Sequence, residues 1–314
     1  MGRAAHRSNT AGTVLVTGAA GFIGCHLVER LVGEGWTVRG LDDERTGDWD
    51  RLEVDLERID KSLEAMSPAE LRDACEGATL LVHLAAEKHN TPEVTGDRTL
   101  SVNVAATARL FDAAAAAGVE KAVFASSLYA YGSLGPAAMS ETDVPTPTTV
   151  YGVSKLAGEH LLRVAERTHG LRWGVARLFF VYGPRQLAEG GYPSVIVRNF
   201  DRIRRNKQPV VNGDGTQALD YVYVDDCVDG LVALAGAEHA VTVNLASGRA
   251  VSVNDLTAAM LRAADSALVP TAGPTDWTDD TCRWGATATV SKRLGWQATT
   301  PLEVGLRRVW DALG

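Results

Sequence analysis

The chain has 314 residues, of which 46% are hydrophobic and 22% are charged. These proportions are ordinary for a soluble globular protein and exclude disorder throughout the chain. The 31 Lys and Arg residues against 39 Asp and Glu residues give a net charge of −8, which argues against a nucleic acid partner.

Membrane and metal signals are missing from the sequence. No segment has the roughly 18 uninterrupted apolar residues that span a bilayer, and the first dozen residues lack the apolar run of a signal peptide. We therefore expect a flexible leader over residues 1–12, no membrane partner and a cytoplasmic location. The four cysteines show neither paired nor metal-type spacing, so we predict no metal site.

A glycine-rich turn follows the first predicted strand, Thr13 to Thr17. It leads directly into a helix-period segment from Phe22 to Val32, which is the order of elements that a nucleotide-binding loop needs. Glycines allow a tight turn and a close approach of the backbone to a pyrophosphate at the start of the helix. Three glycines in a turn are more often structural when taken alone, but this context favours a cofactor site. The cofactor residues predicted here are Gly18, Gly21, Phe22, Ile23 and Gly24.

Two acidic residues, Asp42 and Asp43, end the second predicted strand, Thr37 to Leu41. A carboxylate at this position accepts hydrogen bonds from the adenosine ribose and repels a 2′-phosphate, which favours NAD over NADP. Arg45, close by, is the kind of residue that would reverse this preference. Asp55 and Leu56 follow another short strand and are predicted to flank the adenine, although a surface turn explains them equally well.

A third set of candidates follows the apolar strand from Leu80 to Ala85. Small residues at the carboxyl end of such a strand leave room for a cofactor. The alanine-rich segment from Asp97 to Ala117 is then predicted to be one helix, in which Asn103 is either a cofactor ligand or an ordinary polar residue. The cofactor residues predicted from these stretches are Leu84, Ala85, Ala86, Lys88 and Asn103.

Tyr151 and Lys155 are four residues apart and so share one face of a helix predicted from Val150 to Thr168. A nearby ammonium, helped by a positive nicotinamide ring, favours the phenolate and lowers a pKa that is ordinarily about 10. Tyr151 would then accept a proton from an alcohol while Ser127, 24 residues earlier, polarises the substrate oxygen. Packing explains the pair better when it is taken alone; the glycine turn and Ser127 favour a redox site.

These residues resemble the extended short-chain dehydrogenase/reductase family, in its nucleotide-sugar epimerase and dehydratase branch. The matching segments are Gly18 to Gly24, His83 to Ala86, Ser126 and Ser127 with Tyr131 and Gly132, Tyr151 to Lys155, Arg177 to Pro184, Gly213 to Gly215, Asp220 to Asp226, and Asn244 to Gly248. The resemblance implies an α/β fold with a doubly wound, Rossmann-type, mostly parallel sheet and a smaller C-terminal α/β substrate lobe. It also implies NAD as cofactor, Tyr151 as base, Lys155 on the nicotinamide ribose and Ser127 on the reacting oxygen.

The same resemblance implies a division of the chain and a homodimer. Residues 13–184 would bind NAD, and residues 185–314 would mainly bind a small-molecule substrate, with about 219–250 returning to the sheet. Family members usually pair through two helices, which correspond here to Asp97 to Ala117 and Val150 to Thr168.

Two residues after Ser127 separate the possible reactions. Similar 4,6-dehydratases carry Asp and Glu where this chain has Leu128 and Tyr129, and related decarboxylases tend to carry Glu at the second place. Without those acids, dehydration loses its usual general acid. We therefore favour an NAD-dependent epimerase, in which a transient ketosugar is reduced again from its other face.

The substrate side departs from the family pattern at three places. Phe180 and Leu219 replace the expected Asn and Arg, and Asp279 and Asp280 lie near the place of a further arginine. Either other cations, such as Arg185, Arg198 or Arg283, hold a diphosphate, or the substrate is not a nucleotide sugar. The alternatives are a dehydrogenase or ketoreductase of a non-nucleotide secondary alcohol, a dehydratase or decarboxylase with altered acids, and a non-catalytic NAD-binding protein. The substrate residues predicted are Lys88, Ser127, Tyr129, Phe180, Arg185, Leu219 and Arg283.

Overall fold

A seven-stranded parallel sheet forms the centre of the computed structural model, which describes residues 12–88, 95–132, 136–186, 194–275 and 281–313. Its strand order is β11-β6-β5-β4-β1-β2-β3. The strands are β1 (Thr13–Thr17), β2 (Thr37–Asp42), β3 (Glu57–Asp60), β4 (Ala78–His83), β5 (Lys121–Ser127), β6 (Arg172–Leu178) and β11 (Val241–Leu245). The chain order runs outward in opposite directions from β1 and β4, so a switch point for ligand binding lies between them. The predicted doubly wound fold is confirmed.

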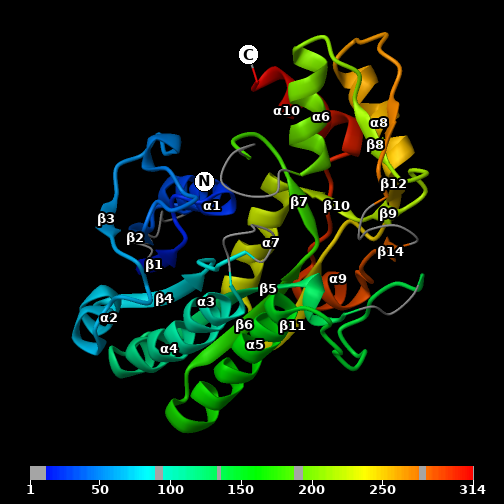
Figure 1. Cartoon of the computed structure of the whole chain (residues 1–314). Coiled ribbons are helices and arrows are strands. Elements are labelled where there is room, and N and C mark those ends of the chain that lie inside the picture. Colours follow the sequence, from blue (N-terminus) through cyan, green and yellow to red (C-terminus); the bar gives the residue numbers. More distant parts are fainter. Residues whose placement is uncertain (1–11, 89–94, 133–135, 187–193, 276–280, 314) are drawn as a thin grey trace, which may run out of the picture.

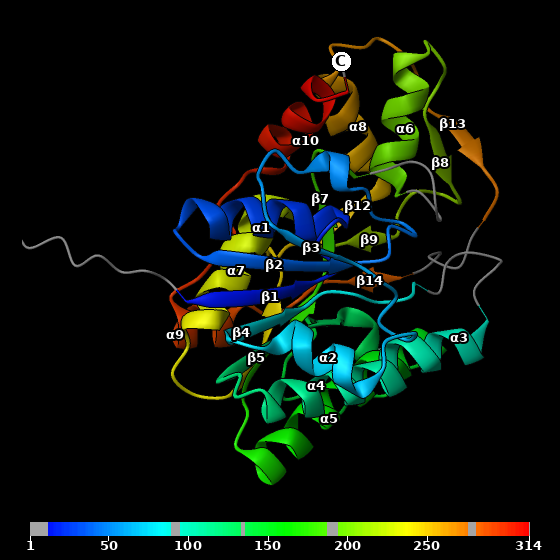
Figure 2. The ribbon, with the colours of Figure 1, turned by 90° about the vertical axis from the view of Figure 1, so that its left-hand side faces the viewer.

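Helices cover both faces of this sheet (Figures 1 and 2). One face carries α1 (Phe22–Gly33) and α7 (Val224–Gly236); the other carries α2 (Pro68–Cys75), α4 (Thr107–Ala116) and α5 (Val150–His169). Side chains of a strand alternate between faces, so Val14 and Val16 enter one core whereas Leu15 enters the other. This double coverage explains why the central strands are apolar throughout.

A smaller lobe packs beyond the carboxyl ends of the central strands (Figure 2). It contains α6 (Val195–Arg204), α8 (Val253–Ala263) and α10 (Leu302–Asp311) around a third apolar core. Its short strands are β7 (Phe180–Tyr182), β8 (Val210–Asn212), β9 (Ala218–Leu219), β10 (Tyr221–Tyr223), β12 (Val251–Ser252), β13 (Thr271–Gly273) and β14 (Cys282–Arg283). Three further short helices lie next to strands of the large sheet. They are η1 (Trp49–Arg51) after β2, η3 (Leu128–Ala130) after β5, and α9 (Ala288–Leu294), which packs against β11.

The helix expected from Asp97 to Ala117 differs from its predicted form, because it consists of α3 (Gly96–Leu100), a π-helix η2 (Ser101–Ala106) and α4. Strand β6 ends at Leu178, because the N–H of Phe179 bonds to Leu245 whereas the N–H of Phe180 bonds to Asp220. The break lets β6 stay in the large sheet while β7 pairs with β10 in the smaller lobe.

Within the described ranges, no helix is long and apolar enough to cross a membrane, and no cluster of three or more His, Cys, Asp or Glu residues could hold a metal ion. The leader predicted over residues 1–12 lies almost wholly outside the described residues, as do Asp279 and Asp280.

Candidate active site

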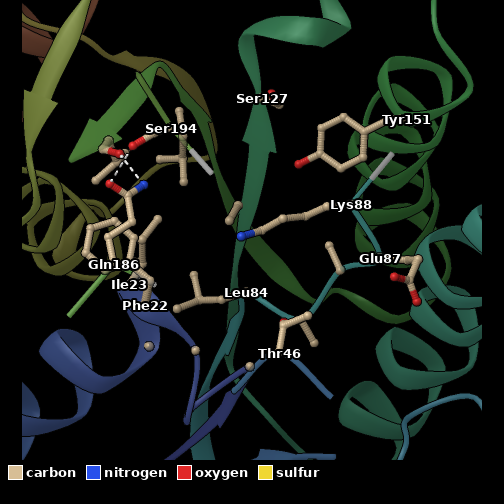
Figure 3. Close-up of a pocket in the computed structure, with 18 of the residues that line it drawn as sticks. Phe22, Ile23, Thr46, Leu84, Glu87, Lys88, Ser127, Tyr151, Gln186 and Ser194 are labelled. Carbon is tan, nitrogen blue, oxygen red and sulfur yellow. Dashed lines mark hydrogen bonds between the residues drawn. The ribbon is translucent and has the colours of Figure 1, made fainter. Parts of the chain in front are cut away.

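One large pocket opens at the carboxyl ends of the central strands and is closed on its other side by α6, β9 and β10. It gathers most of the residues that the sequence singled out. These are Gly18, Gly21, Phe22, Ile23, Gly24, Asp42, Asp43, Leu84, Ala85, Ala86, Lys88, Ser127, Tyr129, Tyr151, Lys155, Phe180 and Leu219. Figure 3 shows its two walls, with Tyr151 and Glu87 on one side and Gln186 and Ser194 on the other.

Five predicted residues do not line this pocket. Asp55 is exposed on the surface, and Leu56 packs against the apolar core beneath β2. The side chain of Asn103 bonds to both backbone groups of Glu87 and to the hydroxyl of Ser154. Two arginines complete the set. Arg185 is bound to both carboxylate oxygens of Glu29 at 2.6 and 2.8 Å, and the Arg283 guanidinium lies 5.5 Å from the ring centre of Tyr129.

The glycine turn has the geometry that a dinucleotide requires. Gly18 has a φ of +71°, which L side chains rarely adopt, and a Cβ there would come within 2.8 Å of the backbone nitrogen of Ala85. A Cβ at Gly24 would lie 1.9 Å from the carbonyl oxygen of Gly18. Only glycine fits at these two positions. The turn therefore exposes the backbone at the start of α1, and the residues present fit a bound pyrophosphate.

Asp42, at the end of β2, is fixed by the loops on either side of it. Its Oδ2 accepts from the N–H of Ala20 at 3.0 Å, and its Oδ1 accepts from the N–H of Glu44 at 2.8 Å. Burial raises the pKa of Asp42, while these two N–H donors oppose the rise. A carboxylate held in this way keeps lone pairs available toward the pocket, where ribose hydroxyls would be bound.

Ser127, Tyr151 and Lys155 come together where β5 meets the first turns of α5. Thr149 caps α5 by accepting from the N–H of Gly152 at 3.0 Å. The Ser127 hydroxyl lies near enough to Tyr151 to lower the pKa of its phenol, and Lys155 donates to the carbonyl of Ala125 at 2.8 Å. The Lys155 Nζ lies 5.6 Å from the ring centre of Tyr151. This arrangement presents a phenol and a hydroxyl to the same point in the pocket (Figure 3).

In the protein, the pKa values of Tyr151 and Lys155 both shift in the direction that favours the neutral side chain. Burial raises the pKa of Tyr151, although the nearby Ser127 hydroxyl opposes the rise. Burial, with a smaller contribution from the charge of Lys88, lowers the pKa of Lys155 to about 7. The lowering of the Tyr151 pKa expected from Lys155 is not among the causes of this shift, in which burial is the largest. Lys88 lies deep in the cleft but is reached by solvent, and its side chain points into the pocket centre (Figure 3).

Several lining residues were not predicted from the sequence. At the cofactor end they are Arg45, Thr46, Arg51, Lys61, Ser62 and Glu87; at the substrate end they are Gln186, Ser194, Val195, Ile196, Asn212, Gln217, Tyr221 and Val253. Arg198, which the sequence named as a possible diphosphate ligand, also lines the pocket. Of the residues that were not predicted, Tyr221 lies in a segment that matched the family pattern, so its position was a usable signal. In the described part of the chain, the Tyr221 hydroxyl and Gln217 Oε1 are buried without a hydrogen bond. Such atoms are positioned to receive a polar ligand.

The fold and this site define a Rossmann-type, dinucleotide-binding enzyme. The chain also matches the model of the NAD dependent epimerase/dehydratase family over residues 14–246. It therefore belongs to the NAD-dependent epimerase/dehydratase family, which confirms the resemblance and the expected cofactor class.

Relatives of known name match most of the chain. A UDP-glucose 4-epimerase of Mycolicibacterium smegmatis is 33% identical over 306 residues, which is 94% of this chain and 96% of the relative. A dTDP-glucose 4,6-dehydratase of Streptomyces griseus is also 33% identical, over 80% of this chain and 78% of the relative. The solved structure of MoeE5 in complex with UDP-glucose and NAD is 33% identical, with a TM-score of 0.85 and coverage of 96% of this chain and 98% of that one.

Proposed function

We propose that the protein is an NAD-dependent epimerase of a nucleotide sugar. The observation that carries this proposal is the set of Ser127, Tyr151 and Lys155 at one point of the pocket, with Leu128 and Tyr129 rather than carboxylic acids following Ser127 in the chain. Leu128 is buried there, with 2% exposure, and Tyr129 packs edge-on against Tyr151 with ring centres 5.9 Å apart. The described carboxylates of the pocket, Asp42, Asp43 and Glu87, follow β2 and β4 instead.

Tyr151 would act as the base that takes the proton of a sugar hydroxyl. NAD, when bound, supplies a reversible acceptor of hydride and a positive charge beside the phenol. Ser127 would donate to the sugar oxygen, and Lys155 would neutralise the phenolate and hold a ribose hydroxyl. Turning of the ketosugar between the two transfers then gives the other epimer. General base catalysis of this kind is worth about 10²- to 10⁴-fold in rate.

Arg198 is our candidate for the cation that holds the diphosphate. It lies on α6 in the pocket wall, on the same side as Leu219 and Tyr221. We also propose a division into an NAD-binding part (13–184) and a substrate part. Residues of 185–314 close the pocket, whereas β11 and α7 return to the large sheet, and both observations support this division.

A second candidate function, a dehydrogenase or ketoreductase of a non-nucleotide alcohol, is favoured by Phe180 and Leu219. Both side chains line the pocket, and neither can donate a hydrogen bond to a phosphate. Leu219 is 6% exposed and belongs to the apolar core of the smaller lobe.

We also propose a homodimer through α3 and α5. Leu100, Val150, Val153 and Val164 are large apolar residues of these helices with between 42% and 53% exposure. Exposed apolar side chains that gather on one surface are typical of a protein interface, and these four belong to two helices that contact each other. A cytoplasmic location stays a prediction.

The reaction is tested by incubating the protein with UDP-, dTDP- and GDP-hexoses and following the sugars by NMR. We expect an equilibrium mixture of two epimers and no accumulation of NADH. Accumulation of NADH with one substrate would select the dehydrogenase, and a 4-keto-6-deoxy sugar would select the dehydratase. Tyr151→Phe serves as the inactive control.

A further inference from the structure

Glu87 closes a network of charged groups at the cofactor end of the pocket. Its Oε2 accepts from Arg45 Nη1 at 2.7 Å and from Arg98 Nε at 2.8 Å. Arg98 in turn donates to Glu64 at 2.6 Å. Glu87 is 8% exposed, and its carboxylate is directed away from the pocket centre, whereas Lys88 points into it (Figure 3).

The backbone of Glu87 is held as firmly as its side chain. Asn103 accepts from the N–H of Glu87 at 2.7 Å and donates to its carbonyl at 2.9 Å. Asn103 also donates to the hydroxyl of Ser154 at 3.0 Å, which ties the end of β4 to α5. The carboxylate of Glu87 is therefore a fixed group rather than a mobile surface charge.

Arg45 is the group on which this carboxylate acts. It follows Asp42 by three residues, in the loop that the adenosine ribose would contact, and its N–H bonds to the side chain of Asp43. Its side chain is 35% exposed and lines the pocket. An arginine near this ribose is the group that accommodates the 2′-phosphate of NADP. The other arginine of this loop, Arg51, donates to the carbonyl oxygens of Ala20 and Thr46.

We propose that Glu87 is a specificity-determining residue that selects NAD over NADP by withholding Arg45 from a 2′-phosphate. The carboxylate satisfies the guanidinium with a charge-assisted bond and adds negative charge to that of Asp42 and Asp43. A 2′-phosphate would have to displace Glu87 and approach three carboxylates, whereas a ribose hydroxyl meets no such cost. This inference depends on the proposed function in one respect only, which is that the pocket binds NAD as its cofactor.

The test measures which dinucleotide the protein holds. Wild-type and variant proteins are equilibrated with an equimolar mixture of NAD⁺ and NADP⁺, and the bound dinucleotides are extracted and quantified by chromatography. For Glu87→Gln we expect the ratio of NADP⁺ to NAD⁺ to rise about tenfold, as the loss of one charge-assisted competitor implies. In the double variant R45M/E87Q the ratio should return to the wild-type value. Glu64→Gln, which removes a partner of Arg98 alone, should leave it unchanged.

An unchanged ratio in Glu87→Gln, or a rise that persists in R45M/E87Q, would overturn the inference. Should Glu87→Gln fail to fold, Arg45→Met tests the same claim. Because Arg45 is already withheld, its loss should leave NADP⁺ binding unchanged, and a marked fall would overturn the inference. The readout is occupancy, so a protein that shows this pattern but epimerises no sugar supports the role of Glu87 while overturning the proposed reaction.

Discussion

The two ends of the pocket differ in how completely the chain satisfies its own polar groups. At the cofactor end, Asp42 and Glu87 each accept two or more hydrogen bonds from the protein. At the substrate end, Phe180 and Leu219 contribute no donor, and the Tyr221 hydroxyl is buried without a hydrogen bond in the described part of the chain. The comparison indicates a cofactor site organised in advance and a substrate site whose polar groups depend more on the ligand.

The largest effect should arise where the two ends meet. Tyr151→Phe removes the proposed base, so kcat for epimerisation should fall by about 10²- to 10⁴-fold. Because the ring remains, binding of NAD and of UDP should be unchanged by calorimetry. Tyr129→Phe, which keeps the ring that packs against Tyr151, is the matched control and should retain most of the activity. A wild-type kcat in Tyr151→Phe would show that Tyr151 is not the base.

The scaffold of the cofactor end is tested at a buried ion pair. Glu159 is fully buried and accepts from Arg177 at 2.8 and 2.9 Å and from Ser126 at 2.6 Å. Glu159→Gln leaves Arg177 as an uncompensated buried charge, and we expect a loss of about 3–5 kcal/mol in the free energy of unfolding. Glu120→Gln breaks an exposed pair with Arg172 and should change stability little in the same denaturant titration. Equal losses in the two variants would contradict this distinction.

The substrate end is tested at Arg198. If it holds a phosphate, Arg198→Met should weaken UDP binding by about tenfold or more, as expected for a charge-assisted hydrogen bond. Affinity for NAD should not change in the same calorimetric series. Arg205→Met, at the exposed end of the same helix where Arg205 pairs with Asp201, is the control. Equal affinity of wild type and Arg198→Met for UDP would assign the diphosphate to another group.

A smaller, pH-dependent effect should arise beneath the cofactor end. His83 bonds to the hydroxyls of Thr17 and Thr107 at 2.6 and 2.9 Å, and burial lowers its pKa to about 3. Its folded pKa lies below the unfolded value, so the unfolded chain gains a proton first as the pH falls below about 6.5. Stability should therefore drop by up to about 1.4 kcal/mol per pH unit between pH 6 and 5. In His83→Gln this slope should become shallower, although His26, whose pKa burial also lowers, still contributes; the exposed His239→Gln should keep the wild-type slope.

Sequence patterns were informative where a local signal carries the function. The glycine turn, the acid after β2 and the spacing of Tyr151 and Lys155 each depend on residues close in the chain, and the structure brings them to one pocket. Arg185, in contrast, is bound by Glu29, which lies 156 positions earlier in the chain. A local sequence pattern cannot predict a partner at that distance. The π-helix around Asn103 and the strand break at Phe179 likewise lie at hydrogen bonds between residues distant in the chain.

The most direct test of the account is the fate of deuterium placed on the carbon that is oxidised. A nucleotide sugar labelled at that carbon is converted by the enzyme, and the label is located in both epimers by NMR and mass spectrometry. We expect the label to return to the same carbon in the product, with none lost to solvent and no accumulation of NADH. Loss of the label to solvent, or its accumulation in NADH, would contradict an epimerase that works through Tyr151 and a transient ketosugar.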